Sequence, residues 1–290
     1  MRDQQASFTA SWVAGWRGLG SLLGDARIAD DPYGARFGGR WARALARAGA
    51  QPAVRAGLIR LPQVASWVGY MQVRTRLFDD QLRSFLAAGG RQIVILGAGY
   101  DCRAARFADR LAGARVFEVD HPATQARKRA VLDEVGASPA VTYVAWHFER
   151  RPLAELPGAL AELGLDVRRP TLTIWEGVTM YLSPEAIDAT VAATRALGGP
   201  GTRLVFNYLT RDMLERPRGL RRLAAAAVAR VGEPFTFGWH PPALPAWLEA
   251  RGWKLTGDRD LAEAALALLP RFVAARVDAS DRHIAVAEKI

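Results

Sequence analysis

Two glycines and a distant carboxylate are the residues whose types and spacing best suit the binding of a small molecule. Gly97 and Gly99 follow the apolar run Ile93 to Leu96, and Asp120 ends a second apolar segment about 20 residues further on. Such runs are typical of strands that are covered on both faces of a parallel sheet. Glycine lets the backbone turn sharply beside a ligand, and an acid at the tip of the second strand can accept hydrogen bonds from ribose hydroxyls. The spacing predicts a nucleoside site.

The glycine pattern favours one class of nucleoside over another. The dinucleotide fingerprint has a third glycine three residues after the second, and Cys102 stands there. Asp101, which we expect to cap the following helix, would also repel a pyrophosphate at the helix N-terminus. S-adenosylmethionine has a ribose and no phosphate, and it fits better. The alternative is an ordinary glycine turn between strand and helix, and we expect Glu118 to assist the turn at the end of the second strand.

Alternating strand and helix patterns after residue 90 must position these side chains. We expect strands at Gln92–Leu96, Arg115–Asp120, 141–146, 171–175 and Arg203–Leu209. We expect helices at 103–111, 122–135, 152–163 and 184–197, three of which begin at a proline, where the missing amide costs no hydrogen bond. This order predicts an α/β fold with a mostly parallel sheet and helices on both faces.

The two ends of the chain add helices and two further strands. Apolar residues recur at helical spacing within 8–23, 41–45 and 64–86. After the fifth strand we expect a helical insertion (212–231), a loop (232–242), a helix (243–250) and strands at 253–256 and 283–288. We therefore expect one domain over 1–290, with an N-terminal helical lid (1–90), a cofactor-binding core (91–209) and a C-terminal part (210–290) that holds the insertion, a cap loop and the final strands.

Composition narrows the classes of partner. The single cysteine, Cys102, excludes an internal disulfide and a cysteine-based zinc cluster, which suits a reducing cytoplasm. No apolar stretch reaches 18 residues, so we expect no membrane partner. The net charge of +10 comes almost wholly from arginines spread along the chain, without an aromatic-interleaved nucleic-acid module. We expect a small acidic substrate and no nucleic acid.

Several short segments occur together in a characteristic order. They are Thr9-Ala10, Arg17, Asp31-Pro32-Tyr33-Gly34-Ala35-Arg36-Phe37, Arg74-Thr75-Arg76-Leu77-Phe78-Asp79-Asp80, Leu96-Gly97-Ala98-Gly99-Tyr100-Asp101-Cys102-Arg103-Ala104, Phe117-Glu118-Val119-Asp120-His121-Pro122, Trp175-Glu176-Gly177-Val178-Thr179-Met180-Tyr181-Leu182 and Gly232-Glu233-Pro234. In this order and spacing they resemble the leucine carboxyl methyltransferase family, in particular its bacterial branch of tetracenomycin-type polyketide O-methyltransferases. The resemblance implies the class I methyltransferase (Rossmann-like) fold, with seven strands and S-adenosylmethionine as cofactor.

The resemblance also implies cofactor-binding residues. Gly97 and Gly99 would face the methionine part, and Asp120, with His121 beside it, the ribose side. Arg74 would bind the cofactor carboxylate, a task that suits the two-pronged guanidinium, with Arg17 as a second anchor.

Three further residues complete the implied cofactor site. His147 and Phe148 stand where the family has an acid and an apolar residue. A neutral imidazole can accept one hydrogen bond from adenine, and protonation would remove that acceptor. Glu176 would lie near the sulfonium.

No metal-ligand spacing and no base dyad stand out, so we assign no metal and no catalytic residue. A carboxylate acceptor, with a reference pKa of about 4, is ionised at neutral pH and needs alignment more than a base. We therefore expect an S-adenosylmethionine-dependent O-methyltransferase that acts on a carboxylate of a small specialised metabolite such as a polyketide. The alternatives are a peptide or protein C-terminal carboxylate, a non-methylating binding protein on the same fold, and a phenol, which would need a base such as His240 or His121.

Overall fold

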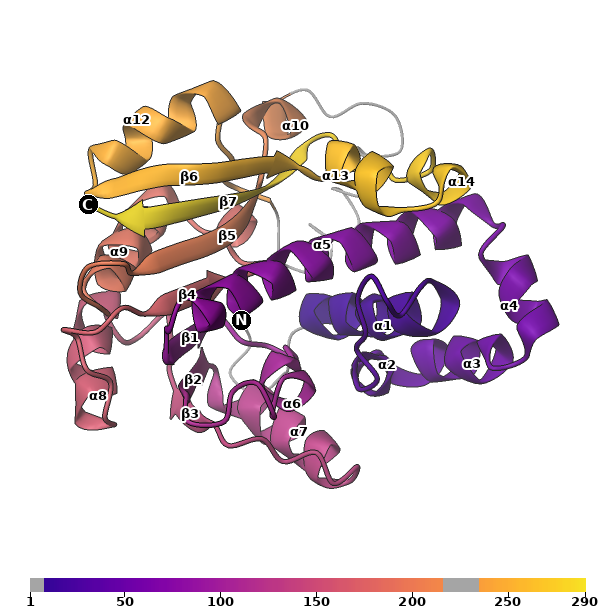
Figure 1. Cartoon of the computed structure of the whole chain (residues 1–290), viewed down its shortest axis with the longest axis horizontal. Coiled ribbons are helices and arrows are strands. Elements are labelled where there is room, and N and C mark those ends of the chain that lie inside the picture. The colour runs from indigo at the N-terminus through magenta and orange to yellow at the C-terminus, as the bar shows by residue number, and fades with distance from the viewer. Residues whose placement is uncertain (1–7, 216–234) are drawn as a thin grey trace.

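The computed structural model describes residues 8–215 and 235–290, and a seven-stranded sheet lies at its centre (Figure 1). The strands are β1 (Gln92–Leu96), β2 (Arg115–Asp120), β3 (Thr142–Ala145), β4 (Leu172–Trp175), β5 (Arg203–Leu209), β6 (Trp253–Asp260) and β7 (Arg282–Lys289). Their order is β3-β2-β1-β4-β5-β7-β6; β1 to β5 are parallel, and β7 is antiparallel to both of its neighbours. The strand order reverses between β1 and β4, and open α/β sheets bind ligands at the carboxyl ends of the strands at such a point.

Helices cover both faces of the sheet, as the alternation of strands and helices predicted. Successive strand residues point to opposite faces, so Ile93 and Ile95 enter one core while Val94 and Leu96 enter the other. The first core is covered by α5 (Pro62–Ala87), on which α13 (Leu261–Leu268) and α14 (Arg271–Ala274) pack, with α6 (Arg103–Arg106) and α7 (Pro122–Asp133) beside them. The second is covered by α8 (Leu156–Glu162), α9 (Pro184–Arg195) and α12 (Leu244–Glu249).

The N-terminal helices lie beside α5 at one end of the molecule (Figure 1). They are α1 (Phe8–Leu23), α2 (Gly34–Phe37), α3 (Gly39–Gly49) and α4 (Pro52–Leu58). The helix α1 passes close to the carboxyl end of β1, because the guanidinium of Arg17 donates to the Tyr100 carbonyl and Ala10 lies near Gly99. The helix α1 of the expected lid segment therefore lies next to the glycine turn; the action of the segment as a lid stays a prediction.

The structure confirms most expected elements and corrects others. α1, β1, β2 and β5 have the expected bounds. The helix expected at 103–111 ends at Arg106, because the backbone of Phe107 leaves the helical region and its side chain enters the core. β6 was expected to end at residue 256 and extends to Asp260, whose carboxylate accepts hydrogen bonds from the first turn of α13. The helices α13 and α14 were not expected. Of the expected insertion, α10 (Arg211–Glu215) is described, and the rest lies outside the described residues.

Candidate functional site

The glycine turn after β1 needs glycine for two separate reasons. Gly97 and Gly99 have φ values of 66° and 48°, in the left-handed region that other residues rarely adopt. A Cβ placed on Gly97 would also lie 2.7 Å from Cγ2 of Val178. The turn after β1 is therefore packed against the segment that follows β4, at the point where the strand order reverses.

Asp120 links the tip of β2 to this turn. Its Oδ2 accepts a hydrogen bond from the Gly99 amide, and its Oδ1 accepts one from the His121 amide at 2.6 Å. Burial raises the pKa of Asp120 in spite of these two bonds. Each carboxylate oxygen can accept a further hydrogen bond, so Asp120 can serve the turn and a ribose at once.

His147, expected on the adenine side, lies against His121, expected beside Asp120, at the ends of β3 and β2. The rings of His121 and His147 meet edge to face, with their centres 4.7 Å apart. Nδ1 of His121 accepts from the Ala123 amide at 3.2 Å and so caps α7. Phe148 is 41% exposed, whereas its neighbour Trp146 is fully buried. The structure thus brings His121 and His147 together, and Phe148 follows His147 as an exposed side chain.

Arg74 and Glu176 form a buried ion pair across the sheet edge. Arg74 comes from α5 and Glu176 follows β4, and Nε of Arg74 lies 2.7 Å from Oε1 of Glu176. Nη1 of Arg74 donates to the Tyr70 hydroxyl at 3.4 Å. The Nε atom is buried and, although close to Glu176, makes no hydrogen bond of regular geometry. The pair holds the two charges together without using every donor of the guanidinium.

Arg103, to which the sequence analysis gave no role, is the centre of the buried charges. Its Nε donates to Asp79 at 2.9 Å, and its Nη1 donates to Glu176 at 2.6 Å and to Asp101. Burial opposes the ionisation of Glu176, but Arg103 and Arg74 hold its pKa below the ordinary value. The pKa of Asp101 is lowered to about 2 against the same burial, chiefly by Arg103. Arg103 therefore ties α5, α6 and the end of β4 into one ionised network.

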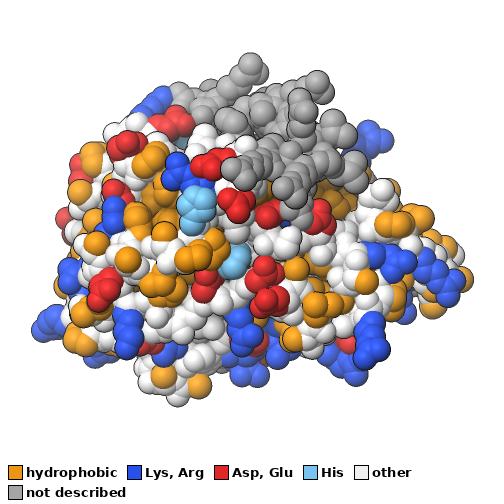
Figure 2. Space-filling model, turned by 90° about the horizontal axis from the view of Figure 1, so that it is seen from above, with side chains coloured by type: hydrophobic (Ala, Val, Ile, Leu, Met, Phe, Trp, Pro, Cys, Tyr) orange, Lys and Arg blue, Asp and Glu red, His pale blue; other side chains and the backbone are white. Residues whose placement is uncertain are grey.

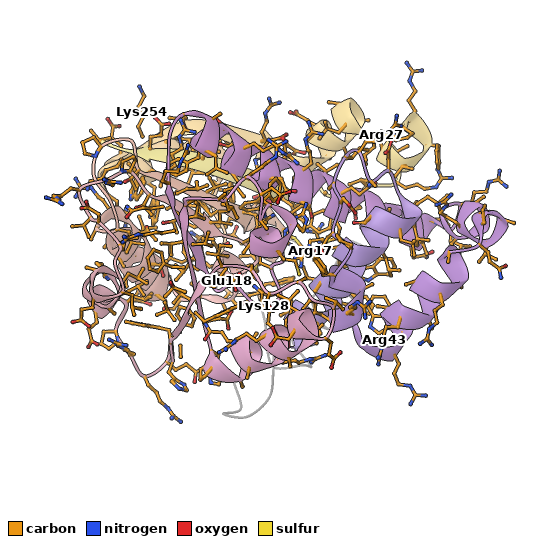
Figure 3. All side chains as sticks on the ribbon, turned by 60° about the horizontal axis from the view of Figure 1, so that its bottom comes forward. Arg17, Arg27, Arg43, Glu118, Lys128 and Lys254 are labelled. Atoms are coloured by element: carbon orange, nitrogen blue, oxygen red, sulfur yellow. The ribbon has the colours of Figure 1, made fainter. Side chains whose placement is uncertain are left out.

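Two expectations about acids near the turn have different outcomes. Asp101 meets the start of α6 as expected, since its Oδ1 accepts from the Arg103 amide at 2.7 Å. The expectation that Glu118 assists the turn is wrong. Glu118 lies within β2, fully buried, and accepts from Nζ of Lys128 in α7 at 2.5 Å (Figure 3). Burial raises the pKa of Glu118 to about 7 in spite of Lys128. The pair fastens α7 to the sheet.

A second guanidinium, that of Arg282, lies near the same tyrosine ring as Arg74. Because β7 is antiparallel, its first residue, Arg282, stands at the carboxyl edge of the parallel strands. The Cζ atoms of Arg282 and Arg74 lie 5.0 and 6.0 Å from the centre of the Tyr70 ring. Among the residues that the structure describes, no carboxylate is ion-paired with Arg282, whose Nη1 donates to the Asp278 carbonyl. This edge therefore holds a cation that can still accept an anionic partner.

The opposite face of the same edge carries a hydrogen-bonded histidine. Nδ1 of His283 lies 3.1 Å from Asp258 Oδ1, and its Nε2 lies 3.8 Å from Asp260 Oδ2. The Tyr208 hydroxyl donates to the other Asp258 oxygen at 2.7 Å. Burial first, and then this bond, raises the pKa of Tyr208. His240 and His121 were the candidate bases expected from the sequence. His283 gives no local signal, because the pairing of β6 with β7 is what places it beside two acids.

Metal-binding and membrane-spanning features are both lacking over the ranges 8–215 and 235–290. No cluster of three or more His, Cys, Asp or Glu side chains there could hold a metal ion. No helix in these ranges combines the length and apolar character needed to cross a bilayer.

Comparisons with known proteins agree with this geometry. A family model described as leucine carboxyl methyltransferase matches residues 10–195. A relative from Mycobacteroides abscessus, provisionally named as an S-adenosyl-L-methionine-dependent methyltransferase, is 33% identical over 277 residues, which cover 90% of this chain and 88% of the relative. A similarly named protein of Mycolicibacterium smegmatis is 37% identical over 213 residues, or 69% of this chain and 64% of its own.

Solved structures share the fold. A DUF574 family protein from Streptomyces avermitilis superposes with a TM-score of 0.56 at 20% identity, over 94% of this chain and 97% of its own. A provisionally named methyltransferase from Thermobifida fusca superposes with a TM-score of 0.55 at 17% identity, over 94% of each chain.

Proposed function

Since the chain belongs to the leucine carboxyl methyltransferase family and is an S-adenosylmethionine-dependent methyltransferase, we propose that it methylates a carboxylate oxygen of a small acidic metabolite such as a polyketide. The observation that carries the proposal is Arg282, a guanidinium with no carboxylate partner among the described residues, next to Tyr70 and the ion pair of Arg74 and Glu176. A cation at this place would hold an acceptor carboxylate over the edge where the methyl donor binds.

The residues at the turn fit the cofactor. Gly97 keeps the turn free of a side chain, and Asp120 retains acceptor capacity for ribose hydroxyls. Nη2 of Arg103 is buried without a hydrogen-bond partner in the described structure, and Nε of Arg74 lies close to Glu176 without a hydrogen bond of regular geometry. Such unsatisfied donors cost stability, and the carboxylate of the methionine moiety would satisfy a guanidinium. Glu176 would then lie beside the positive sulfonium.

Methyl transfer to a carboxylate needs no general base from the protein, because the acceptor oxygen is already ionised. Bound S-adenosylmethionine would supply the electrophilic methyl group that this oxygen accepts. Acceleration then comes from holding the two reactants in register and excluding water. Arg282 would supply the orientation of the acceptor and Tyr70 a flat apolar neighbour. The C-terminal carboxylate of a peptide could use the same anchor.

A second candidate, transfer to a phenol or alcohol, is supported by His283. An imidazole oriented by an aspartate is an arrangement that can remove a proton from a hydroxyl, and His283 lies against Asp258 at the same sheet edge. Both candidates require S-adenosylmethionine and differ in the oxygen that is methylated.

One experiment separates the two candidates. The protein is incubated with methyl-labelled S-adenosylmethionine and a set of aromatic acids and phenols, and each product is treated with mild base. A carboxyl methyl ester releases labelled methanol, whereas an aryl ether keeps its label. We expect base-labile label, a raised KM for the acid in Arg282→Gln, and unchanged S-adenosylhomocysteine affinity in that variant. Base-stable label that depends on His283 would replace the first proposal with the second.

A further inference from the structure

The N-terminal helices carry an unusual distribution of charge. No Asp or Glu occurs between Pro32 and Phe78, while arginines recur throughout. Six of these arginines are exposed and come from α2, α3, α4 and their junctions: Arg36, Arg40, Arg43, Arg47, Arg55 and Arg60. None of them forms an ion pair within the part of the chain that the structure describes. Arg17, Arg74 and Arg103 at the site pair with acids, so these six, which we call the basic end, need a separate explanation.

The helix α3 gathers three of these arginines around one depression. Arg40, Arg43 and Arg47 are three and four residues apart, so they lie along one helix face. Together with Trp41 they line an open depression on the surface, and Figure 3 shows Arg43 pointing away from the protein. Several guanidinium groups around one hollow suit a phosphate group. Tryptophan is favoured at the boundary between a bilayer and water.

The helix α4 adds exposed apolar surface to the basic end. No residue of Pro52–Leu58 is buried. Val54 is 37% exposed and Leu61, just beyond the helix, is 51% exposed. α4 stands at the right-hand end of the molecule in Figure 1, and at that end Figure 2 shows basic and hydrophobic side chains next to one another. The apolar residues are thus placed at a projecting end, flanked by arginines.

We propose that the basic end, together with the helices α2 to α4 that carry most of it, docks on the surface of a bilayer that contains anionic phospholipids. The arginines would contact lipid phosphates, and Val54 and Leu61 would enter the boundary between headgroups and acyl chains. A second copy of the chain is disfavoured as occupant, because the two basic ends would repel each other. The expectation of no membrane partner came from the lack of a spanning segment, which a surface contact does not need.

The test uses the full chain and flotation with two kinds of vesicle, pure phosphatidylcholine and phosphatidylcholine mixed with phosphatidylglycerol. We expect binding to the mixed vesicles that high salt weakens, and little binding to the neutral ones. Arg43→Glu/Arg47→Glu should lower the partition coefficient roughly tenfold or more, since each basic residue near an anionic surface contributes about fivefold. Val54→Ser/Leu61→Ser should also weaken binding.

The matched control is Arg168→Glu/Arg169→Glu, which changes the net charge equally at exposed positions after α8. It should float like the wild type, and S-adenosylhomocysteine binding checks the folding of each variant. No binding to the mixed vesicles, equal binding to neutral ones, or equal loss in the control would overturn the proposal. Binding of duplex DNA that depends on Arg43 and Arg47, without vesicle binding, would assign the surface to nucleic acid instead.

Discussion

Nε of Arg74 lies 2.7 Å from Oε1 of Glu176, so an N-terminal helix and the segment after β4 share one buried pair of charges. The family resemblance assigned the arginine to the carboxylate of the cofactor and the glutamate to its sulfonium. Both groups of the cofactor are thus expected to meet a pair that is already neutral. A carboxylate bound at Arg74 and a sulfonium bound near Glu176 would each meet an opposite charge of this pair.

Removing one partner of this network should destabilise the fold. Glu176→Gln leaves Arg74 and Arg103 with less negative charge, and breaking a buried pair costs about 3–5 kcal/mol. Urea unfolding measures the change in the free energy of unfolding. Glu155→Gln, which breaks the exposed pair with Arg151, is the control and should cost about 0–1 kcal/mol. An equal loss of unfolding free energy in the two variants would show that the buried network stabilises the fold no more than an exposed ion pair does.

Asp120→Ala should weaken cofactor binding. The substitution removes acceptors for ribose hydroxyls and for the Gly99 amide, and hydrogen bonds to charged groups contribute about 1.5–3 kcal/mol. Titration calorimetry with S-adenosylhomocysteine should show the loss. Asp212→Ala, an exposed acid in α10, is the control and should bind normally. Wild-type affinity in Asp120→Ala would remove the carboxylate from the cofactor site.

The stability of the protein should fall as the pH rises from 4.5 towards 7. Burial raises the pKa of Glu118 from its ordinary 4.5 to about 7, so over this interval the folded state binds more protons than the unfolded state and loses stability as the pH rises. The contribution is at most about 3 kcal/mol. Glu118→Gln should flatten this part of the profile of unfolding free energy against pH, although Lys128 loses its partner. If the slope of unfolding free energy against pH were the same in Glu118→Gln as in the wild type, the pKa of Glu118 would not be the cause of the pH dependence.

Gly97→Ala should destabilise the protein, because the positive φ and the contact with Val178 both oppose a side chain. Strained backbone of this kind costs about 1–3 kcal/mol. Gly158→Ala, in helix α8 with open space around it, should instead gain about 0.5–1 kcal/mol. Thermal unfolding of the two variants compares them directly, and a shift of the same sign in both would refute the argument.

The sheet and the tips of its strands could be predicted from the sequence, whereas the charge network could not. β1 and β5 are largely apolar runs bounded by glycine or polar residues, so their bounds could be predicted from the sequence. A residue directly after a strand, such as Glu176, could also be placed, because the strand fixes its position at the sheet edge. The partners of Arg103 come from α5, from the turn before α6 and from the residue after β4, and the contact of Arg282 with Tyr70 joins residues more than 200 positions apart. Such contacts depend on packing and strand register, which local patterns do not encode.

A crystal structure with S-adenosylhomocysteine tests the central claim most directly, namely that the turn at Gly97 and Gly99 and the carboxylate of Asp120 hold the cofactor at the strand-order reversal. We predict ribose hydroxyls within hydrogen-bond distance of Asp120 and the amino-acid end of the ligand at Arg74. A nucleoside bound elsewhere, with both residues unchanged from the contacts described above, would contradict the account.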